Sequence, residues 1–181
     1  MSQFKTIEAS QVTISELMLP SHTNFSGKIH GGYILSLMDQ IAFACASKHS
    51  SNYCVTASVD TVDFLRPLEG GELVVMKASV NFVGRTSMVV GIRVEAEDIH
   101  SGTIKHCNSS YFTMVAKDDS GKSVPVPGLI LKTEKQVRRF LKSLNRQEMK
   151  KTHRNETSKK TELQIEDLEI LRNSHKVQLE Y

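Results

Sequence analysis

The chain has 181 residues, a formal net charge of +3 and 39% hydrophobic residues, which is enough for one domain of ordinary size with a core. The net charge is too small to indicate a nucleic-acid partner, and no apolar run approaches membrane-spanning length. The three cysteines, Cys45, Cys54 and Cys107, show no CxxC spacing, which argues against a zinc site or a disulfide framework. Since the N-terminus also lacks an apolar signal segment, these features predict a soluble cytoplasmic protein with no membrane partner.

The first third of the chain predicts a strand, a loop and one long helix. Residues 11–19 form the expected opening strand, which stops at Pro20 before a polar loop over residues 20–30. A helix is then predicted from about Gly31 to Lys48, apolar almost all round and therefore buried.

Four runs that alternate between apolar and polar residues follow the helix. The first begins at Val55 and closes at residues 64–67, and the last two cover residues 88–96 and 103–115. In the second run, one face holds Val74, Met76, Ala78, Val80 and Phe82. Period-two patterning joined by short turns predicts an antiparallel meander, and hence a five-stranded antiparallel sheet wrapped around the helix. Because such a sheet has exposed edges, we expect at least a dimer.

The end of the chain differs from the body in charge. Residues 132–181 hold 13 Lys and Arg against 8 Asp and Glu, whereas residues 1–131 have a net charge of −2. The sequence therefore predicts a body over 1–131 and a basic helical extension over 132–181. Within the extension we expect a helix around residues 137–144, a polar linker over 152–160 and a second helix over 163–171. Scattered acidic residues and scarce aromatics argue against nucleic-acid binding by this extension.

The most informative stretch lies where the polar loop meets the helix. Gly31 and Gly32 are poor helix formers, but at a first turn they let another molecule approach free backbone N–H groups. Those N–H groups suit an oxygen that gains negative charge. Asp39 follows two turns later, within reach of that helix end, and a carboxylate on an apolar helix is a candidate general base. The alternative is that Asp39 caps a neighbouring loop or faces solvent at a subunit edge.

His30 stands just ahead of the helix and could help to bind or polarise a carbonyl, although capping is the commoner role for such a residue. His100 and His106 flank a turn without a Cys or carboxylate at ligand spacing, so we expect no metal site there.

A set of short motifs in a fixed order points to a known family. They are Thr23–Gly27 (TNFSG), His30–Gly32 (HGG), Met38–Asp39, Val55–Thr56, Phe64–Pro67 (FLRP) and Gly84–Met88 (GRTSM). Over roughly residues 10–130 the chain resembles the hotdog-fold acyl-CoA thioesterases, in particular the acyl-CoA hydrolase branch of small bacterial enzymes and two-domain cytosolic animal hydrolases. The resemblance implies an α+β hotdog fold, with a long central helix in a five-stranded antiparallel sheet.

The resemblance also implies an active site assembled across a dimer interface. Asn24 of one subunit would orient the water or the thioester, and Asp39 of the other would activate the water. The backbone N–H groups near Gly31 and Gly32 would hold the oxyanion. Thr56 would add a hydroxyl to the water, although threonine is also an ordinary strand residue.

The resemblance also favours coenzyme A contacts at four further residues: Arg66 could contact the phosphates, and Arg85, Thr86 and Ser87 could form a cradle for pantetheine or phosphate. The alternative for Arg66 is a strand-end charge, and for Arg85 an ordinary hairpin turn.

The implied reaction is hydrolysis of acyl-CoA to a free acid and coenzyme A. It needs no metal and no separate cofactor, because a thiolate is a good leaving group and coenzyme A is part of the substrate and product. A trimer of dimers is common in the family. The alternatives are an enoyl-CoA hydratase-like enzyme and a regulatory module of the same fold that binds acyl-CoA without chemistry.

Overall fold

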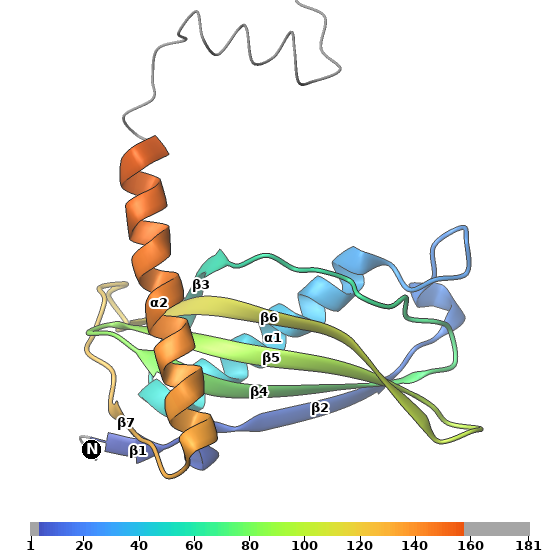
Figure 1. The fold of residues 1–181 in the computed structure, drawn as a ribbon, viewed down its shortest axis with the longest axis horizontal. Coiled ribbons are helices and arrows are strands. Elements are labelled where there is room, and N and C mark those ends of the chain that lie inside the picture. The colour runs from blue at the N-terminus through green and yellow to red at the C-terminus, as the bar shows by residue number, and fades with distance from the viewer. Residues whose placement is uncertain (1–3, 158–181) are drawn as a thin grey trace, which may run out of the picture. The chain divides into compact units, whose positions relative to one another are not determined.

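The computed structural model of the chain describes residues 4–157 and the side chains of residues 4–152 (Figure 1). The chain divides into two compact units, and the division falls within the last helix, between Ser143 and Leu144. The elements in chain order are β1 (Phe4–Thr6), η1 (Glu8–Ser10), β2 (Val12–Leu17), η2 (Pro20–His22), α1 (Gly31–Ser50), β3 (Tyr53–Val59), β4 (Leu73–Val83), β5 (Ser87–Asp98), β6 (Thr103–Lys117), β7 (Gly128–Ile130) and α2 (Glu134–Thr157).

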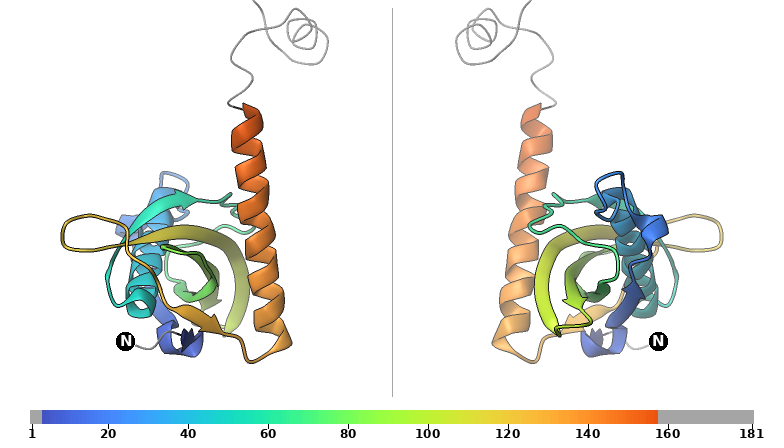
Figure 2. Two further views of the ribbon diagram at one scale, coloured as in Figure 1. Left: turned by 90° about the vertical axis from the view of Figure 1, so that its left-hand side faces the viewer. Right: turned by 90° about the vertical axis from the view of Figure 1, so that its right-hand side faces the viewer.

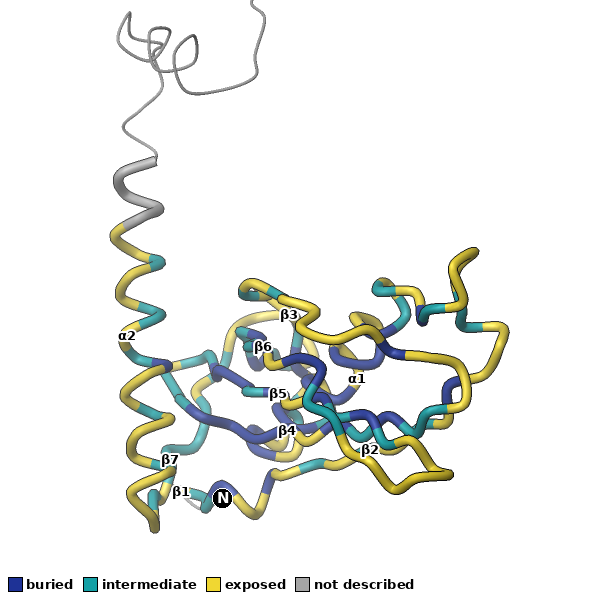
Figure 3. Tube along the Cα trace, turned by 45° about the vertical axis from the view of Figure 1, so that its right-hand side comes forward, coloured by how far each residue is buried: buried dark blue, intermediate teal, exposed yellow. Residues whose placement is uncertain are grey.

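One antiparallel sheet with strand order β2-β4-β5-β6-β3 forms the body. The sheet curls around α1, and the first part of α2 lies on the opposite face (Figure 2). The predicted five-stranded sheet with one long central helix is therefore confirmed, and α1 ends only two residues beyond the predicted boundary. The buried positions follow β4 and β5 (Figure 3).

The edge strand β3 is shorter than predicted. It pairs with β6 from Tyr53 to Val59, with a bulge between Thr56 and Ser58. Beyond Val59 only isolated bonds join the chain to β6, such as Asp60 N–H to Tyr111 O at 2.9 Å. The prediction of a strand as far as residues 64–67 is wrong, because the ladder with β6 ends at Val59 and Pro67 cannot donate to a ladder.

A second bulge explains where one aromatic side chain lies. The register between β4 and β5 shifts between Val80 and Phe82, so Phe82 leaves the face that it was predicted to share with Val80. Phe82 instead contacts Phe140 of α2, with ring centroids 5.1 Å apart.

The last helix is longer than the sequence suggested. It runs to Thr157, through the first residues of the stretch 152–160 that was predicted to be a linker. Residues 152–157 include the helix formers Arg154 and Glu156 and hold no Gly or Pro, so a polar composition there does not end the helix. The rest of that linker and the helix predicted over 163–171 lie outside the described residues. The short parallel pair of β1 and β7 was not predicted.

The sequence predicted that the central helix would be buried all round, but only one face of it is buried. Its inner face contributes Ile34, Leu37, Met38, Ile41 and Cys45 to the core. Its other face is exposed, and holds Gly32, Leu35, Ser36, Asp39, Gln40 and Phe43. No helix within residues 4–157 is long and apolar enough to cross a membrane.

The C-terminal end of α1 carries a buried histidine. His49 is fully buried, and its Nε2–H donates to the Pro127 carbonyl at 2.9 Å, while Nδ1 has no partner among the described residues. Burial lowers the pKa of His49, and the Lys5 ammonium lowers this pKa further.

This lowered pKa gives a testable pH dependence. Between the folded and unfolded pKa values the unfolded chain binds more protons, so stability rises with pH there and falls on acidification. We expect the free energy of unfolding to fall more steeply for wild type than for His49→Gln between about pH 7 and about pH 5. Urea unfolding at a series of pH values measures both slopes, and equal slopes would contradict the role of His49.

Candidate active site

Two of the candidate residues meet in an open groove between α1 and β3. The Thr56 hydroxyl donates a hydrogen bond to Asp39 Oδ1 at 2.5 Å. The groove has a volume of about 520 Å³ and is lined by Asp39, Gln40, Phe43, Tyr53, Cys54, Val55 and Thr56. A carboxylate that is already held by a hydroxyl at the mouth of a groove can accept a proton from a bound water.

Two elements position this pair. Asp39 lies on the exposed face of α1, because the helical period points Met38 and Ala42 into the core instead. Thr56 lies on the edge strand β3, immediately before the bulge, and its hydroxyl also contacts Met114 Sδ at 3.5 Å. Both residues are exposed in the single chain.

Asn24 lies in a tightly bonded loop. Its Oδ1 accepts hydrogen bonds from Ser26 N–H at 2.9 Å, from the Ser26 hydroxyl at 2.7 Å and from Lys28 N–H at 3.1 Å. Asn24 N–H donates to Lys28 O at 2.7 Å, and a bridge between Thr23 and Ile29 closes the loop. The Asn24 oxygen is therefore used within the loop, whereas its Nδ2 donates to no other residue of the described chain.

The N-terminus of α1 presents free donors. The N–H groups of Gly31 and Gly32 make no hydrogen bond within residues 4–157, as is usual for the first turn of a helix. His30 is the N-cap residue, but its side chain makes no capping bond, so a capping role for the imidazole is wrong. The Phe64 ring packs over Gly31, 3.4 Å from where a Cβ would lie.

A cluster of His22, Tyr33 and Glu16 holds both ends of the Asn24 loop. The sequence did not predict this cluster. The His22 and Tyr33 rings stack with centroids 4.0 Å apart, and Tyr33 donates a hydrogen bond to the Glu16 carboxylate. This bond raises the pKa of Tyr33. His22 O also accepts from His30 N–H at 2.9 Å, so β2, the loop and the first turn of α1 are tied together. No spacing in the sequence indicates this stack, which depends on the tertiary fold.

The candidate coenzyme A residues lie at opposite ends of β6. Arg66 follows Leu65, whose N–H donates to Cys107 O at 3.0 Å, and Thr86 O accepts from Ala116 N–H at 3.0 Å. Nine residues of strand separate these two contacts, or about 30 Å. Arg66 is therefore near the N-terminus of α1, while Arg85, Thr86 and Ser87 are near the other end of the sheet.

The catalytic candidates are only partly brought together in one chain. Asp39 and Thr56 are hydrogen bonded, but Asn24 makes no recorded contact with either. Eight residues of helix separate Gly31 from Asp39, which is about 12 Å along the axis. The expectation that Asp39 reaches the N-terminus of its own helix therefore does not fit the helical geometry.

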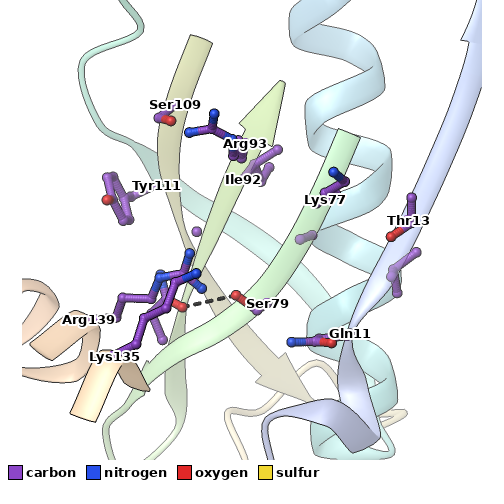
Figure 4. A pocket seen from close by; sticks show the side chains of 14 residues that line it. Gln11, Thr13, Lys77, Ser79, Ile92, Arg93, Ser109, Tyr111, Lys135 and Arg139 are labelled. Carbon is purple, nitrogen blue, oxygen red and sulfur yellow. Dashed lines mark hydrogen bonds between the residues drawn. The ribbon is translucent and has the colours of Figure 1, made fainter. Parts of the chain in front are cut away.

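A second cavity lies on the outer face of the sheet, away from Asp39. It has a volume of about 440 Å³ and is lined by residues of β2, β4, β5, β6 and α2, including Lys77, Arg93, Lys135 and Arg139 (Figure 4). The Ser79 hydroxyl donates to Asn81 Oδ1 at 3.1 Å in its wall. Lys77 and Arg93 both pair with Glu95. Because α1 occupies the opposite face, this cavity is not part of the Asp39 groove.

The described residues hold no cluster of three or more His, Cys, Asp or Glu suited to a metal. The three cysteines are free thiols and are buried. Burial raises the pKa of Cys45 to about 12 and also raises that of Cys107.

These thiols should react slowly in the folded protein. Only the thiolate attacks a disulfide reagent, and a pKa of about 12 leaves roughly one Cys45 in ten thousand ionised at pH 8. We expect almost no fast reaction of the native protein with an aromatic disulfide reagent, and three reacting thiols in denaturant. A thiol that reacts at the free-cysteine rate in the native protein would show that one site is open.

Comparisons with known proteins place this geometry in a family. The family model described as thioesterase superfamily matches residues 26–103. The VdlD protein of Helicobacter pylori is 42% identical over 145 residues, which cover 80% of this chain and 83% of that protein. The Bacillus subtilis protein YkhA, named as an uncharacterized acyl-CoA thioester hydrolase, is 36% identical over 71% of this chain and 74% of that protein. The human cytosolic acyl coenzyme A thioester hydrolase is 32% identical over 75% of this chain and 36% of that protein.

Solved structures of acyl-CoA thioesterases are also similar to this chain. A hexameric acyl-CoA thioesterase in its apo form has a TM-score of 0.81 at 37% identity, covering 83% of this chain and 97% of that one. The acyl-CoA hydrolase of Staphylococcus aureus, solved with butyryl coenzyme A and coenzyme A, has a TM-score of 0.80 at 31% identity, covering 86% and 95%. That enzyme was also solved as variants in which an aspartate, a threonine or an asparagine is replaced by alanine.

Proposed function

Since the chain belongs to the thioesterase superfamily and is a thioester hydrolase with the hotdog fold, we propose that it hydrolyses acyl-CoA to a free carboxylic acid and coenzyme A. The observation that carries the mechanism is the hydrogen bond from Thr56 to Asp39 at the mouth of an open groove. It supplies an oriented carboxylate with room for a water and a thioester beside it.

The proposed active site is shared between two copies. One copy supplies Asn24 and the N–H groups of Gly31 and Gly32, and the other supplies Asp39 and Thr56. During the reaction the base contacts the water, the water contacts the carbonyl carbon, and the carbonyl oxygen contacts the oxyanion donor. Each contact is about 3 Å long, and the path through these groups bends at the carbonyl. That path is shorter than the helical separation of about 12 Å between Gly31 and Asp39 of one chain, so a second copy is needed to complete it.

The chemistry follows from these positions. Asp39 takes a proton from the water while the water oxygen attacks the thioester carbon. The carbonyl oxygen becomes an oxyanion, which the Gly31 and Gly32 N–H groups and the positive end of the helix dipole stabilise. Asn24 Nδ2 donates to the water or to the thioester oxygen. When the intermediate collapses, the C–S bond breaks, the acid forms and the proton passes to the coenzyme A thiolate. No step calls for a metal or a separate cofactor, because the thiolate is a good leaving group.

The Staphylococcus aureus variants support this choice of residues. They replace an asparagine, an aspartate and a threonine, and the intervals between the three replaced positions equal those between Asn24, Asp39 and Thr56.

We assign coenzyme A contacts to both copies. Phe64 covers Gly31, so Arg66 belongs to the half of the site that holds the oxyanion donors and His30. Ser87 pairs with Val115, which also pairs with Val55 next to Thr56, so Arg85, Thr86 and Ser87 belong to the half with the base. In a shared site the phosphates of one coenzyme A would meet guanidinium groups from two chains.

We also propose at least a dimer, and a trimer of dimers as the full assembly. Related thioesterases of known structure are hexameric, including one from Yersinia pestis. The exposed edge strand β3 and the exposed face of α1 are the surfaces that a second copy would cover. The human relative is named as cytosolic, which supports a cytoplasmic location.

Mixing two variants with impaired activity tests the shared site. We expect Asp39→Ala to lower kcat about 10²- to 10⁴-fold with little change in KM, and Asn24→Ala to lower kcat less. Co-refolding the two should restore about a quarter of wild-type activity, because half of random dimers are mixed and each has one intact site. Thiol release from acyl-CoA gives the readout.

The control for this experiment is Asp119→Ala, which removes an exposed carboxylate from a turn outside the groove and should leave the rate unchanged. No recovery on mixing, with mixed dimers verified by mass, would mean that each site lies within one chain.

The role of Thr56 has its own test. Thr56→Val keeps the shape but cannot donate to Asp39, and a hydrogen bond to a charged group contributes about 1.5–3 kcal/mol. We expect kcat to fall about ten- to a hundred-fold in Thr56→Val and to stay near wild type in Thr56→Ser. Steady-state kinetics with one acyl-CoA measures both, and equal losses in the two variants would show that strand packing matters rather than the hydroxyl.

A further inference from the structure

Phe25 is the most exposed apolar side chain of the described residues. Its relative exposure is 113%, whereas the other exposed large apolar side chains lie between 37% and 71%. Single exposed apolar residues are ordinary on protein surfaces, but most of them contact neighbouring side chains. Phe25 extends fully away from the rest of its own chain.

A loose loop does not explain this exposure. Phe25 sits in the turn closed by the Asn24 Oδ1 bonds to Ser26 and Lys28, and Gly27 N–H donates to Asn24 O at 3.0 Å. Lys28 in turn pairs with Glu69 across the loop. The ring is therefore held outward by a loop closed by these bonds, where a surface outside the chain could cover it.

The neighbour of Phe25 indicates where that surface lies. Adjacent Cα atoms are 3.8 Å apart, so an approach that brings Asn24 to Asp39 of a second copy also brings the Phe25 backbone beside the same groove, within reach of its ring. The side-chain oxygen of Asn24 points into the loop. Phe25 is therefore the apolar side chain that this loop would present to the second copy.

The groove has an aromatic wall that such a ring fits. Phe43 and Tyr53 lie edge to face with centroids 5.6 Å apart, and they are 39% and 62% exposed. Phe43 follows Asp39 by one helical turn, or about 6 Å along the axis. An acyl chain whose carbonyl lies beside Asp39 therefore has an apolar surface to run along, and that surface is open on one side in the single chain.

We propose that Phe25 of one copy closes the acyl slot of a second copy against Phe43 and Tyr53, and so limits the length of acyl chain that the enzyme accepts. This assignment rests on the shared site proposed above. Phe25 is a specificity-determining residue here. It contacts the acyl chain and takes no part in proton transfer. Apolar slots discriminate by about ten- to 200-fold for each methylene that does or does not fit, so one ring can set a length limit.

Three substitutions test the proposal over a series of substrates from acetyl-CoA to palmitoyl-CoA. Phe25→Ala opens the slot, so the ratio of kcat/KM for the longest to the shortest substrate should rise at least about ten-fold. Phe25→Trp fills more space and should move this ratio the other way. Phe25→Leu keeps an apolar side chain and should give a profile between those of wild type and Phe25→Ala.

Leu141→Ala is the matched control, because Leu141 is an exposed apolar residue (52%) on α2. Its chain-length profile should equal that of wild type. Dimer content of each variant is measured by light scattering. An equal loss of kcat/KM at every length in Phe25→Ala would make Phe25 a dimer anchor only and would overturn the proposal, as would an unchanged profile.

Failure of the proposal can be told apart from failure of the shared site. Recovery of activity on mixing Asn24→Ala with Asp39→Ala reports on the shared site alone. Recovery together with an unchanged Phe25→Ala profile would leave the shared site intact and exclude the role of Phe25.

Discussion

The rise of an α-helix is the constraint on which the active site depends. The free N–H groups and the carboxylate lie on the same helix, but eight residues of α1 separate Gly31 from Asp39 by about 12 Å. A rigid helix cannot bring them closer, so in the proposed mechanism one chain holds two half-sites. One half has a polar loop and the start of α1. The other has the middle of α1 and the edge strand β3, joined by the bond between Thr56 and Asp39. Two copies placed with their helices side by side would form two complete sites at once, which is the usual consequence of two-fold symmetry.

Each half is fixed by contacts that do not take part in the chemistry. Asn24 uses its side-chain oxygen to close its own loop, which leaves the amide hydrogens for the donor role proposed above. Closing the loop and donating to the water or the thioester are therefore compatible roles for Asn24, because three bonds to its oxygen orient its amide nitrogen. The stack of His22 on Tyr33 ties that loop to the first turn of α1. Such preorganisation matters because a misplaced donor loses much of its effect on a transition state.

The sequence predicted the elements whose signals are local. The period-two runs gave β4, β5 and β6, and the change from a polar loop to a helical period gave the start of α1. The sequence-based prediction failed where tertiary contacts determine the structure. The bulge that turns Phe82 outward leaves no mark in the alternation of apolar residues, and β3 ends where its ladder with β6 is lost. The spacing of Asn24 and Ser26 before Gly27 is a common turn signal that could have indicated the bonded loop. Composition misled the prediction over residues 152–157, since a polar stretch without Gly or Pro can continue a helix.

The exposed face of α1 explains why a catalytic carboxylate can be built on a helix that also forms the core. The inner face of α1 packs against the sheet. The outer face can therefore hold Asp39 together with apolar residues such as Leu35 and Phe43. In a single chain the carboxylate is solvated and costs nothing to expose. A second copy that covers Leu35 and Phe43 gains apolar burial and removes water from Asp39 in the same step. The Thr56 hydroxyl then keeps the carboxylate hydrogen bonded as solvent leaves. In the proposed mechanism, assembly and catalysis are therefore coupled through one helix face, because the contacts that hold two copies together would also shelter the base that activates the attacking water.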